Sequence, residues 1–138
     1  MAPSLYTFTS ETLSALRKFR FGSSRVDKMQ AIIYTIDKGS YEIKREDEDQ
    51  VIDNIEELTE ELPDNSPRFV VLSYPFKLSD GRLKTPLVLL YWRPPTCGQE
   101  SKMLYAGSVE LMREKAGVAK VIEISDEEDF EDLEDQLK

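Results

Sequence analysis

The chain has no histidine and a single cysteine, Cys97, among its 138 residues. One cysteine cannot form an internal disulfide or a thiolate cage for a metal ion, which fits a reducing compartment such as the cytosol. As a catalytic nucleophile, Cys97 would lack the histidine base that usually activates a thiol. We therefore expect no disulfide, no metal site built on cysteine and no cysteine–histidine catalysis.

Long apolar runs and glycine-rich loops are also missing. The longest apolar run, Leu87 to Trp92, is far too short to cross a bilayer, and residues 1–8 lack the basic and apolar regions of a signal peptide. The six glycines never gather into a phosphate-binding loop, and no Gly-Lys-Ser/Thr sequence occurs. No carboxylate pair stands out for acid–base chemistry. These features predict a soluble intracellular protein without catalytic residues or cofactors.

Acidic residues dominate the composition, which gives a formal net charge of −9, and they are unevenly spread. Residues 42–64 contain eleven acidic and two basic residues, residues 126–138 contain eight acidic residues and one lysine, and residues 1–25 are net basic. Such a chain is a poor general ligand for nucleic acids or membranes, although a local basic face could steer it to an acidic protein surface. The tail acids lack the spacing and turn glycine of a calcium loop, so we predict no metal site.

Hydrophobic periodicity predicts one α/β (α+β) domain over residues 1–138, with a core of about residues 10–125 and an acidic C-terminal helix of about 126–138. Strands are expected at 29–36, 40–45, 68–74, 83–92 and 120–124. The apolar stripe from Val51 to Leu62 predicts a helix that ends at Pro63. Asp80-Gly81 is typical of a hairpin turn. The order of elements implies a central mixed β-sheet flanked by helices on both faces.

The helix that begins at Ser101 is predicted to be the longest in the chain. At 100° per residue one broad arc is apolar and should face the core, namely Leu104, Tyr105, Val109, Leu111, Met112 and Ala116. The opposite arc, expected to face solvent, holds Lys102, Met103, Ala106, Gly107, Glu110, Arg113 and Glu114. A large apolar side chain beside small residues on an outer face suits a partner surface. The alternative is an incidental exposed methionine in a frayed first turn, since single surface apolar residues are common.

Two further helices carry charge at their ends. Ser10 is expected to cap the first helix, and basic residues at its C-terminal end would favourably compensate the helix dipole. In the tail, Ser125 and Glu128 fit a capping box, with Phe130, Leu133 and Leu137 as a narrow apolar seam. Ser125 precedes three acidic residues, so it is also a candidate for an acidophilic kinase, although the capping role is preferred.

Several motifs in order resemble the ADF/cofilin homology family, and more closely its glia maturation factor branch. They are Leu16 to Phe21, Glu61 to Pro63 followed by Ser66 to Val71, Asp80 to Arg82 with Pro86-Leu87, Met103 to Ser108, and Lys120 to Ile124. The resemblance covers nearly the whole chain. It implies the fold of that family, an ADF/cofilin homology domain.

The resemblance also implies a non-enzymatic regulator that binds the actin-related protein 2/3 complex, dissociates filament branches and inhibits branch nucleation. Proteins of this branch dock their long helix and N-terminal segment in a groove of the actin-like subunit. The implied primary face is Ser4, Leu5, Lys102, Met103, Ala106, Gly107 and Glu110, and the implied secondary basic face is Arg17, Lys18, Arg20, Arg25 and Arg82. Ser4 and Ser125 are candidate phosphorylation sites. We expect a cytoplasmic monomer on cortical branched actin networks, with the nucleus as a second compartment.

The alternative within the same resemblance is a cofilin-type protein that binds and severs actin itself. Cofilins use a more basic long helix, but here Val109 stands where they commonly carry lysine, and Leu111 to Lys115 replaces a lysine-rich stretch. The acidic tail also opposes a second contact with the acidic surface of actin. The sequence therefore favours branch regulation, with weak or no binding to actin.

Overall fold

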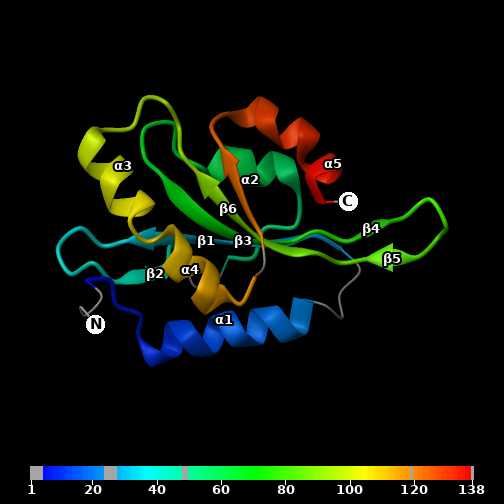
Figure 1. The fold of residues 1–138 in the computed structure, drawn as a ribbon, viewed down its shortest axis with the longest axis horizontal. Coiled ribbons are helices and arrows are strands. Elements are labelled where there is room, and N and C mark those ends of the chain that lie inside the picture. Colours follow the sequence, from blue (N-terminus) through cyan, green and yellow to red (C-terminus); the bar gives the residue numbers. More distant parts are fainter. Residues whose placement is uncertain (1–4, 24–27, 48–49, 119, 138) are drawn as a thin grey trace.

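The computed structural model of the protein describes residues 5–23, 28–47, 50–118 and 120–137. A five-stranded sheet with strand order β2-β1-β3-β6-β7 forms its centre (Figure 1). These strands are β1 (Gln30–Ile36), β2 (Ile43–Arg45), β3 (Arg68–Ser73), β6 (Leu87–Trp92) and β7 (Val121–Ile124). The helices are α1 (Ser10–Ser23), α2 (Ile55–Glu61), α3 (Gln99–Ala106), α4 (Val109–Ala116), the 3-10 helix η1 (Glu127–Asp132) and α5 (Leu133–Leu137).

The central sheet is mixed. Strands β2, β1, β3 and β6 pair antiparallel along the sheet, whereas β6 and β7 are parallel. The parallel pair needs a long crossover, and α3 and α4 supply it. This arrangement confirms the predicted mixed sheet with helices. None of the helices in the described ranges is long and apolar enough to cross a membrane.

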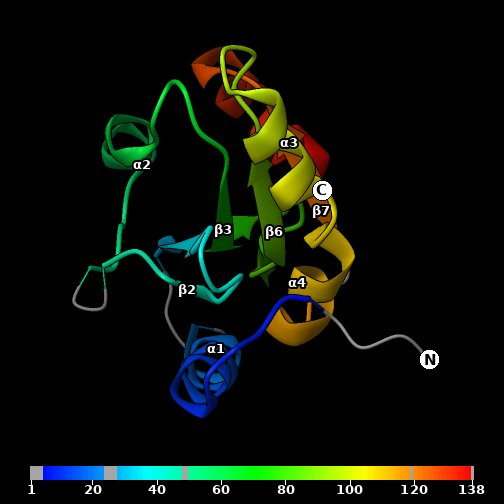
Figure 2. The ribbon, with the colours of Figure 1, turned by 90° about the vertical axis from the view of Figure 1, so that its left-hand side faces the viewer.

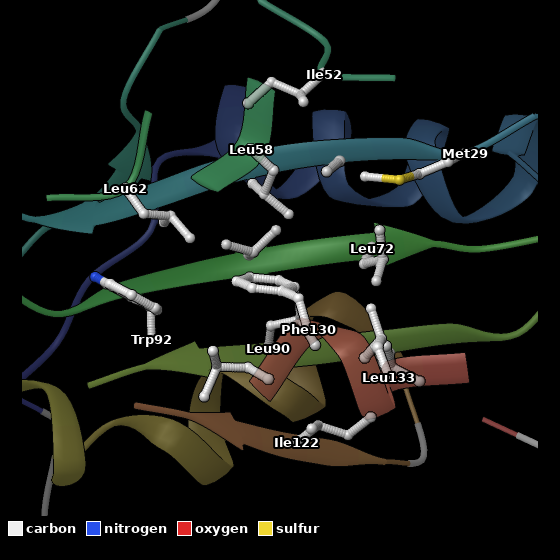
Figure 3. Packing of buried hydrophobic residues seen from close by; sticks show 14 of the residues in the cluster. Met29, Ile52, Leu58, Leu62, Leu72, Leu90, Trp92, Ile122, Phe130 and Leu133 are labelled. Carbon is white, nitrogen blue, oxygen red and sulfur yellow. The ribbon is translucent and has the colours of Figure 1, made fainter. Parts of the chain in front are cut away.

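Alternating residues of each strand point to opposite faces, so the sheet has two cores. In β3, Phe69 and Val71 belong to the cluster under α1, α3 and α4, whereas Val70 and Leu72 belong to the cluster under α2 and the tail. Figure 3 shows the second cluster, in which Leu58 of α2 and Phe130 of η1 cover the strands. Figure 2 shows α2 and α1 on different sides of the sheet.

The tail contributes directly to that second cluster. The predicted seam is confirmed, because Phe130, Leu133 and Leu137 are all buried there. The predicted cap is wrong: the Asp126 carboxylate accepts from the Glu128 N–H at 2.7 Å, and the Asp129 side chain completes the capping box. The tail begins as the 3-10 helix η1 and continues as α5.

Proline and a tertiary bridge shorten two predicted elements. The strand expected at 83–92 is interrupted before β6 at Pro86, and its first part forms a separate two-stranded hairpin of β4 (Phe76–Lys77) and β5 (Leu83–Lys84). The turn of that hairpin contains Gly81 at a φ of +89°, as its Asp-Gly sequence predicted. The helix expected from Val51 begins only at Ile55, because Ile52 pairs with Ala31 in a β-bridge and Asn54 caps α2.

The first helix is capped by Thr9 rather than by Ser10, since the Thr12 N–H donates to Thr9 Oγ1 at 3.1 Å. With 14 residues, α1 is the longest helix in the described part of the chain. The helix predicted to be longest is instead divided into α3 and α4, each of 8 residues. The break lies at Gly107-Ser108.

Candidate partner-binding site

A tertiary hydrogen bond accounts for the break between α3 and α4. In a continuous helix the Leu104 carbonyl would accept the Ser108 N–H. Here it accepts the Tyr6 hydroxyl at 2.7 Å, and the Ser108 N–H donates to Tyr105 O at 3.1 Å. A Cβ at Gly107 would lie 2.7 Å from the Tyr6 hydroxyl oxygen, so glycine leaves the space that this contact requires.

The N-terminal segment is also held by backbone bonds beside β2. The Thr7 N–H donates to Tyr41 O at 3.0 Å, and the Ile43 N–H donates to Thr7 O at 2.8 Å. The rings of Tyr6 and Tyr41 lie 5.9 Å apart between centroids. Residues 5–7 therefore form a short strap between the β1–β2 turn and α3.

The β1–β2 turn places Tyr41 in an uncommon conformation. Its φ of +60° lies in the left-handed region that non-glycine residues rarely occupy. The Asp37 carboxylate accepts the Gly39 N–H at 2.9 Å, and the Tyr41 N–H donates to Asp37 O at 2.7 Å. Hydrogen bonding from the Gly39 backbone lowers the pKa of Asp37 below its usual value. The closed turn thus holds the Tyr41 ring in place against the strap.

The strap, the turn and α3 surround a hollow of about 300 Å³, which we call the α3 hollow. Its lining is Leu5, Tyr6, Lys38, Tyr41, Glu100, Met103 and Leu104. Leu5 is 70% exposed, Met103 is 66% exposed and Tyr41 is 36% exposed. Three large apolar side chains that water still reaches thus converge on one depression, with one ammonium and one carboxylate beside them.

The implied primary face and the lining of the α3 hollow share only some of their residues. Leu5 and Met103 line the α3 hollow, Lys102 is half-buried, and Ala106 and Gly107 are exposed at the end of α3. Glu110 lies on α4, where its carboxylate pairs with Arg113 Nε at 3.0 Å. Ser4 lies outside the described residues.

Five residues of the α3 hollow were not among the sequence candidates, namely Tyr6, Lys38, Tyr41, Glu100 and Leu104, the last of which was expected to face the core. No periodic pattern marks Tyr41, because its place depends on the turn. On the inner arc Met112 is fully buried, whereas Leu111 is only half-buried, so the expectation of a core position at Leu111 is wrong. Because the predicted single helix is divided into α3 and α4, residues after Gly107 point in other directions than they would in one continuous helix.

The implied secondary basic face is divided between elements. Arg17 and Lys18 are exposed on α1. Arg20 is half-buried: a Cβ at Gly117, the end of α4, would meet its guanidinium, which also lies 4.9 Å from the centre of the Phe21 ring. Arg82 lies in the turn of the β4–β5 hairpin, which projects from the sheet (Figure 1), and pairs with Asp80 at 2.7 Å. Arg25 lies outside the described residues.

In the described ranges the structure contains no assembled metal site. There, no three side chains of histidine, cysteine, aspartate or glutamate are grouped so that they could hold a metal ion. Cys97 is buried as a free thiol.

Comparison with known proteins identifies the family. Residues 6–138 match the family described as cofilin/tropomyosin-type actin-binding protein. Protein AIM7 of Saccharomyces cerevisiae is 48% identical over 149 residues, which cover 97% of this chain and 97% of the relative. Human glia maturation factor beta is 38% identical over 120 residues, which cover 87% of this chain and 82% of the relative.

A solved structure agrees with these relatives. The solution structure of glia maturation factor from Caenorhabditis elegans superposes with a TM-score of 0.78 at 38% identity, and the match covers 99% of each chain. The fold, the motifs and the full-length matches thus agree. The chain belongs to the ADF/cofilin homology family of actin-regulatory proteins, which act by binding rather than by catalysis, and within it to the glia maturation factor branch.

Proposed function

We propose that the protein regulates branched actin networks by docking on the actin-like subunit of the actin-related protein 2/3 complex. Docking would promote dissociation of filament branches and inhibit nucleation of new ones. The observation that supports this proposal is the convergence of exposed Leu5, Tyr41 and Met103 on the α3 hollow. Apolar side chains at the centre of a contact, surrounded by polar groups, commonly provide most of the binding free energy.

The position of the α3 hollow also fits the docking mode implied by the resemblance. That mode uses the N-terminal segment together with the long helix, and the Tyr6–Leu104 hydrogen bond joins these two elements into one surface. Because Tyr6 and Thr7 are already ordered by hydrogen bonds, a partner would gain contact with Leu5 and Met103 at a lower entropic cost.

The alternative function, cofilin-type binding and severing of actin, is less well supported by the outer surface of α4. Arg113 is the first basic residue of α4, but its Nε pairs with Glu110 and its Nη1 donates to Val118 O at 3.1 Å. Its charge is therefore partly balanced by Glu110, and Lys115 is the one other basic residue of α4. We propose weak or no binding to actin on this ground.

Arg17 and Lys18 are proposed as the accessible part of the secondary basic face, where they would speed association with an acidic surface of the complex or of the branch junction. We further propose a monomer that works in the cytoplasm at cortical actin networks. Ser4 and Ser125 remain candidate phosphorylation sites. Ser125 is exposed, and its hydroxyl takes no part in the helix cap, which Asp126 and Asp129 make.

Binding measurements with separate partners test the proposal. The protein should co-pellet with the purified complex and with branched filaments, and it should bind monomeric or unbranched actin far more weakly. Branch lifetimes seen by fluorescence microscopy should shorten. Equal or tighter binding to actin alone, with severing of unbranched filaments, would instead establish the cofilin-type function.

A further inference from the structure

A buried tyrosine joins α3 to the end of β1. The Ile36 N–H donates to the hydroxyl oxygen of Tyr105 at 3.0 Å, and the same oxygen lies 2.9 Å from Thr35 Oγ1. Because the Tyr105 oxygen already accepts from a backbone N–H, its own hydrogen is available to the threonine oxygen. One phenol hydroxyl thus connects α3 to two consecutive residues of β1, 70 and 69 positions earlier in the sequence.

The Ile36 N–H depends on this hydroxyl because no strand of the described chain pairs with it on that side. N–H groups along a strand alternate between its two neighbours. The Asp37 N–H donates to Glu42 O on the β2 side of β1, so the N–H of Ile36 points to the β3 side. There the pairing of β1 with β3 ends at Tyr34. The hydroxyl of Tyr105 takes the place of the missing strand carbonyl.

Tyr105 is also the main buried anchor of α3. Ser101 and Tyr105 are the buried residues of this helix, and Tyr105 is 2% exposed, with its ring centroid 5.3 Å from that of Phe69 in the core. α4 packs closely against α1 and β6, whereas α3 approaches no other element of the described chain as closely. The position of α3 therefore depends strongly on the contacts of one side chain.

The Tyr105 hydroxyl connects two walls of the α3 hollow. α3 carries Met103, and the β1–β2 turn, which begins directly after Ile36, carries Tyr41. The hydrogen bond from Ile36 to Tyr105 therefore constrains the distance between these two apolar side chains. A partner groove that receives both side chains requires them at one spacing, and a spacing set before docking lowers the entropic cost of binding.

We propose that Tyr105 is a positioning residue of the docking surface: without touching the partner, its hydroxyl holds Met103 and Tyr41 at the spacing that the partner requires. This role rests on the proposed function, because the partner is the one expected at the α3 hollow. Loss of the hydroxyl leaves α3 in several arrangements relative to the β1–β2 turn. The apparent affinity then falls in proportion to the fraction of molecules in the competent arrangement.

Tyr105→Phe removes the hydroxyl and keeps the ring, so it tests this role. Affinity for the purified complex, corrected for the folded fraction, should fall roughly threefold to tenfold, as expected for the loss of a buried hydrogen bond. Tyr91→Phe is the matched control. Tyr91 is 5% exposed, its ring centroid lies 5.7 Å from that of the same Phe69, and its hydroxyl has no hydrogen-bond partner in the described chain. The affinity of Tyr91→Phe should equal that of the wild type.

A double-mutant cycle separates positioning from a general loss of stability. If Tyr105 acts through Met103, Tyr105→Phe should weaken binding less in a Met103→Ala background than in the wild type. Thr35→Val should weaken binding less than Tyr105→Phe does, because the Ile36 N–H keeps its acceptor. Equal losses in the two backgrounds, or wild-type affinity of Tyr105→Phe, would overturn the proposal.

Amide hydrogen exchange tests the same role without the complex. Tyr105→Phe should speed exchange at Ile36 and along α3 roughly threefold to tenfold, while the amides of α4 exchange at the wild-type rate. Unchanged exchange in α3, or an equal increase in α3 and α4, would overturn the positioning role. If the wild type did not bind the complex, the proposed function would be wrong, and the exchange rates would still decide whether the hydroxyl holds α3.

Discussion

The two ends of the described chain both fold back onto the sheet, but they use their apolar side chains in opposite ways. At the C-terminal end, Phe130, Leu133 and Leu137 are buried in the core. At the N-terminal end, polar bonds from Tyr6 and Thr7 hold the strap, and Leu5 stays 70% exposed. The tail thus buries its apolar side chains in the core, whereas the strap leaves Leu5 accessible to a partner.

This difference teaches that attachment and burial are separate properties of a terminal segment. A strap fixed by a few directed hydrogen bonds is ordered without a large loss of accessible apolar area. A tail fixed by packing gains about 25 cal/mol per Å² of apolar surface removed from water, and nothing of its seam remains for a partner. Substitutions at the two ends should therefore separate stability from affinity.

The largest effect is expected at the tail. Leu133→Ala should lower the free energy of unfolding by about 2–5 kcal/mol, because it leaves a cavity under a side chain that is only 1% exposed. Chemical denaturation measures this loss. Affinity for the complex, corrected for the folded fraction, should not change; a specific loss of affinity would break the division between the two ends.

The second effect is expected at the α3 hollow. Met103→Ala should weaken binding to the complex by about 1–3 kcal/mol, as at a central contact, and should change stability by no more than about 0.5 kcal/mol, as for an exposed residue. The matched control is Val51→Ala, an apolar side chain 46% exposed near α2. A Met103→Ala protein that binds like Val51→Ala would remove the α3 hollow from the docking surface.

The third effect concerns how the strap is attached. Gly107→Ala places a methyl group against the Tyr6 hydroxyl, so the loss of that hydrogen bond, about 1 kcal/mol, should offset the better helix propensity of alanine. In a Tyr6→Phe background the same change should stabilise by about 0.5–1 kcal/mol, because the obstructing hydroxyl is gone. A double-mutant cycle measures the coupling. Additive changes would show that the contact does not hold the strap.

The smallest effect is expected on α1. Charge reversal of the exposed pair Arg17 and Lys18 to Glu should slow association with the complex at low salt, and the difference should shrink at high salt, because exposed charges are screened beyond roughly 10 Å at 0.1 M ionic strength. Stopped-flow association rates measure this. Arg20→Glu should instead lower stability, since Arg20 lies against the end of α4. If the association rates depended neither on salt concentration nor on the charges of Arg17 and Lys18, α1 would have only a structural role.

Much of the fold was predictable because it depends on local periodicity. Alternating and continuous apolar runs located β1, β3 and β7, and the spacing of the tail seam located three core residues. The errors occurred where a distant group competes for the backbone. Ile52 pairs with Ala31 in a β-bridge instead of joining the predicted helix. The Leu104 carbonyl accepts the hydroxyl of Tyr6, 98 residues away in the sequence, instead of a helical N–H.

In the candidate site, too, positions set by local sequence were predictable and positions set by distant contacts were not. Met103 was predicted on the outer face from its helical position alone, and it is exposed there. Tyr41 could not be predicted, because its place depends on the left-handed turn and on the strap that crosses it. Arg20 and Arg17 look equivalent in the sequence, but only the neighbouring end of α4 distinguishes a packed guanidinium from an accessible one.

The parallel pairing of β6 with β7 has a consequence for the order of events during synthesis. β7 and the tail emerge from the ribosome after every other strand, yet they supply one edge of the sheet and part of the cover of one core. Until they arrive, Leu90 and its neighbours on that face stay open to water and to other chains. Nascent chains stalled before Val121 should therefore recruit chaperones, and folding of β7, η1 and α5 onto the sheet should end that association.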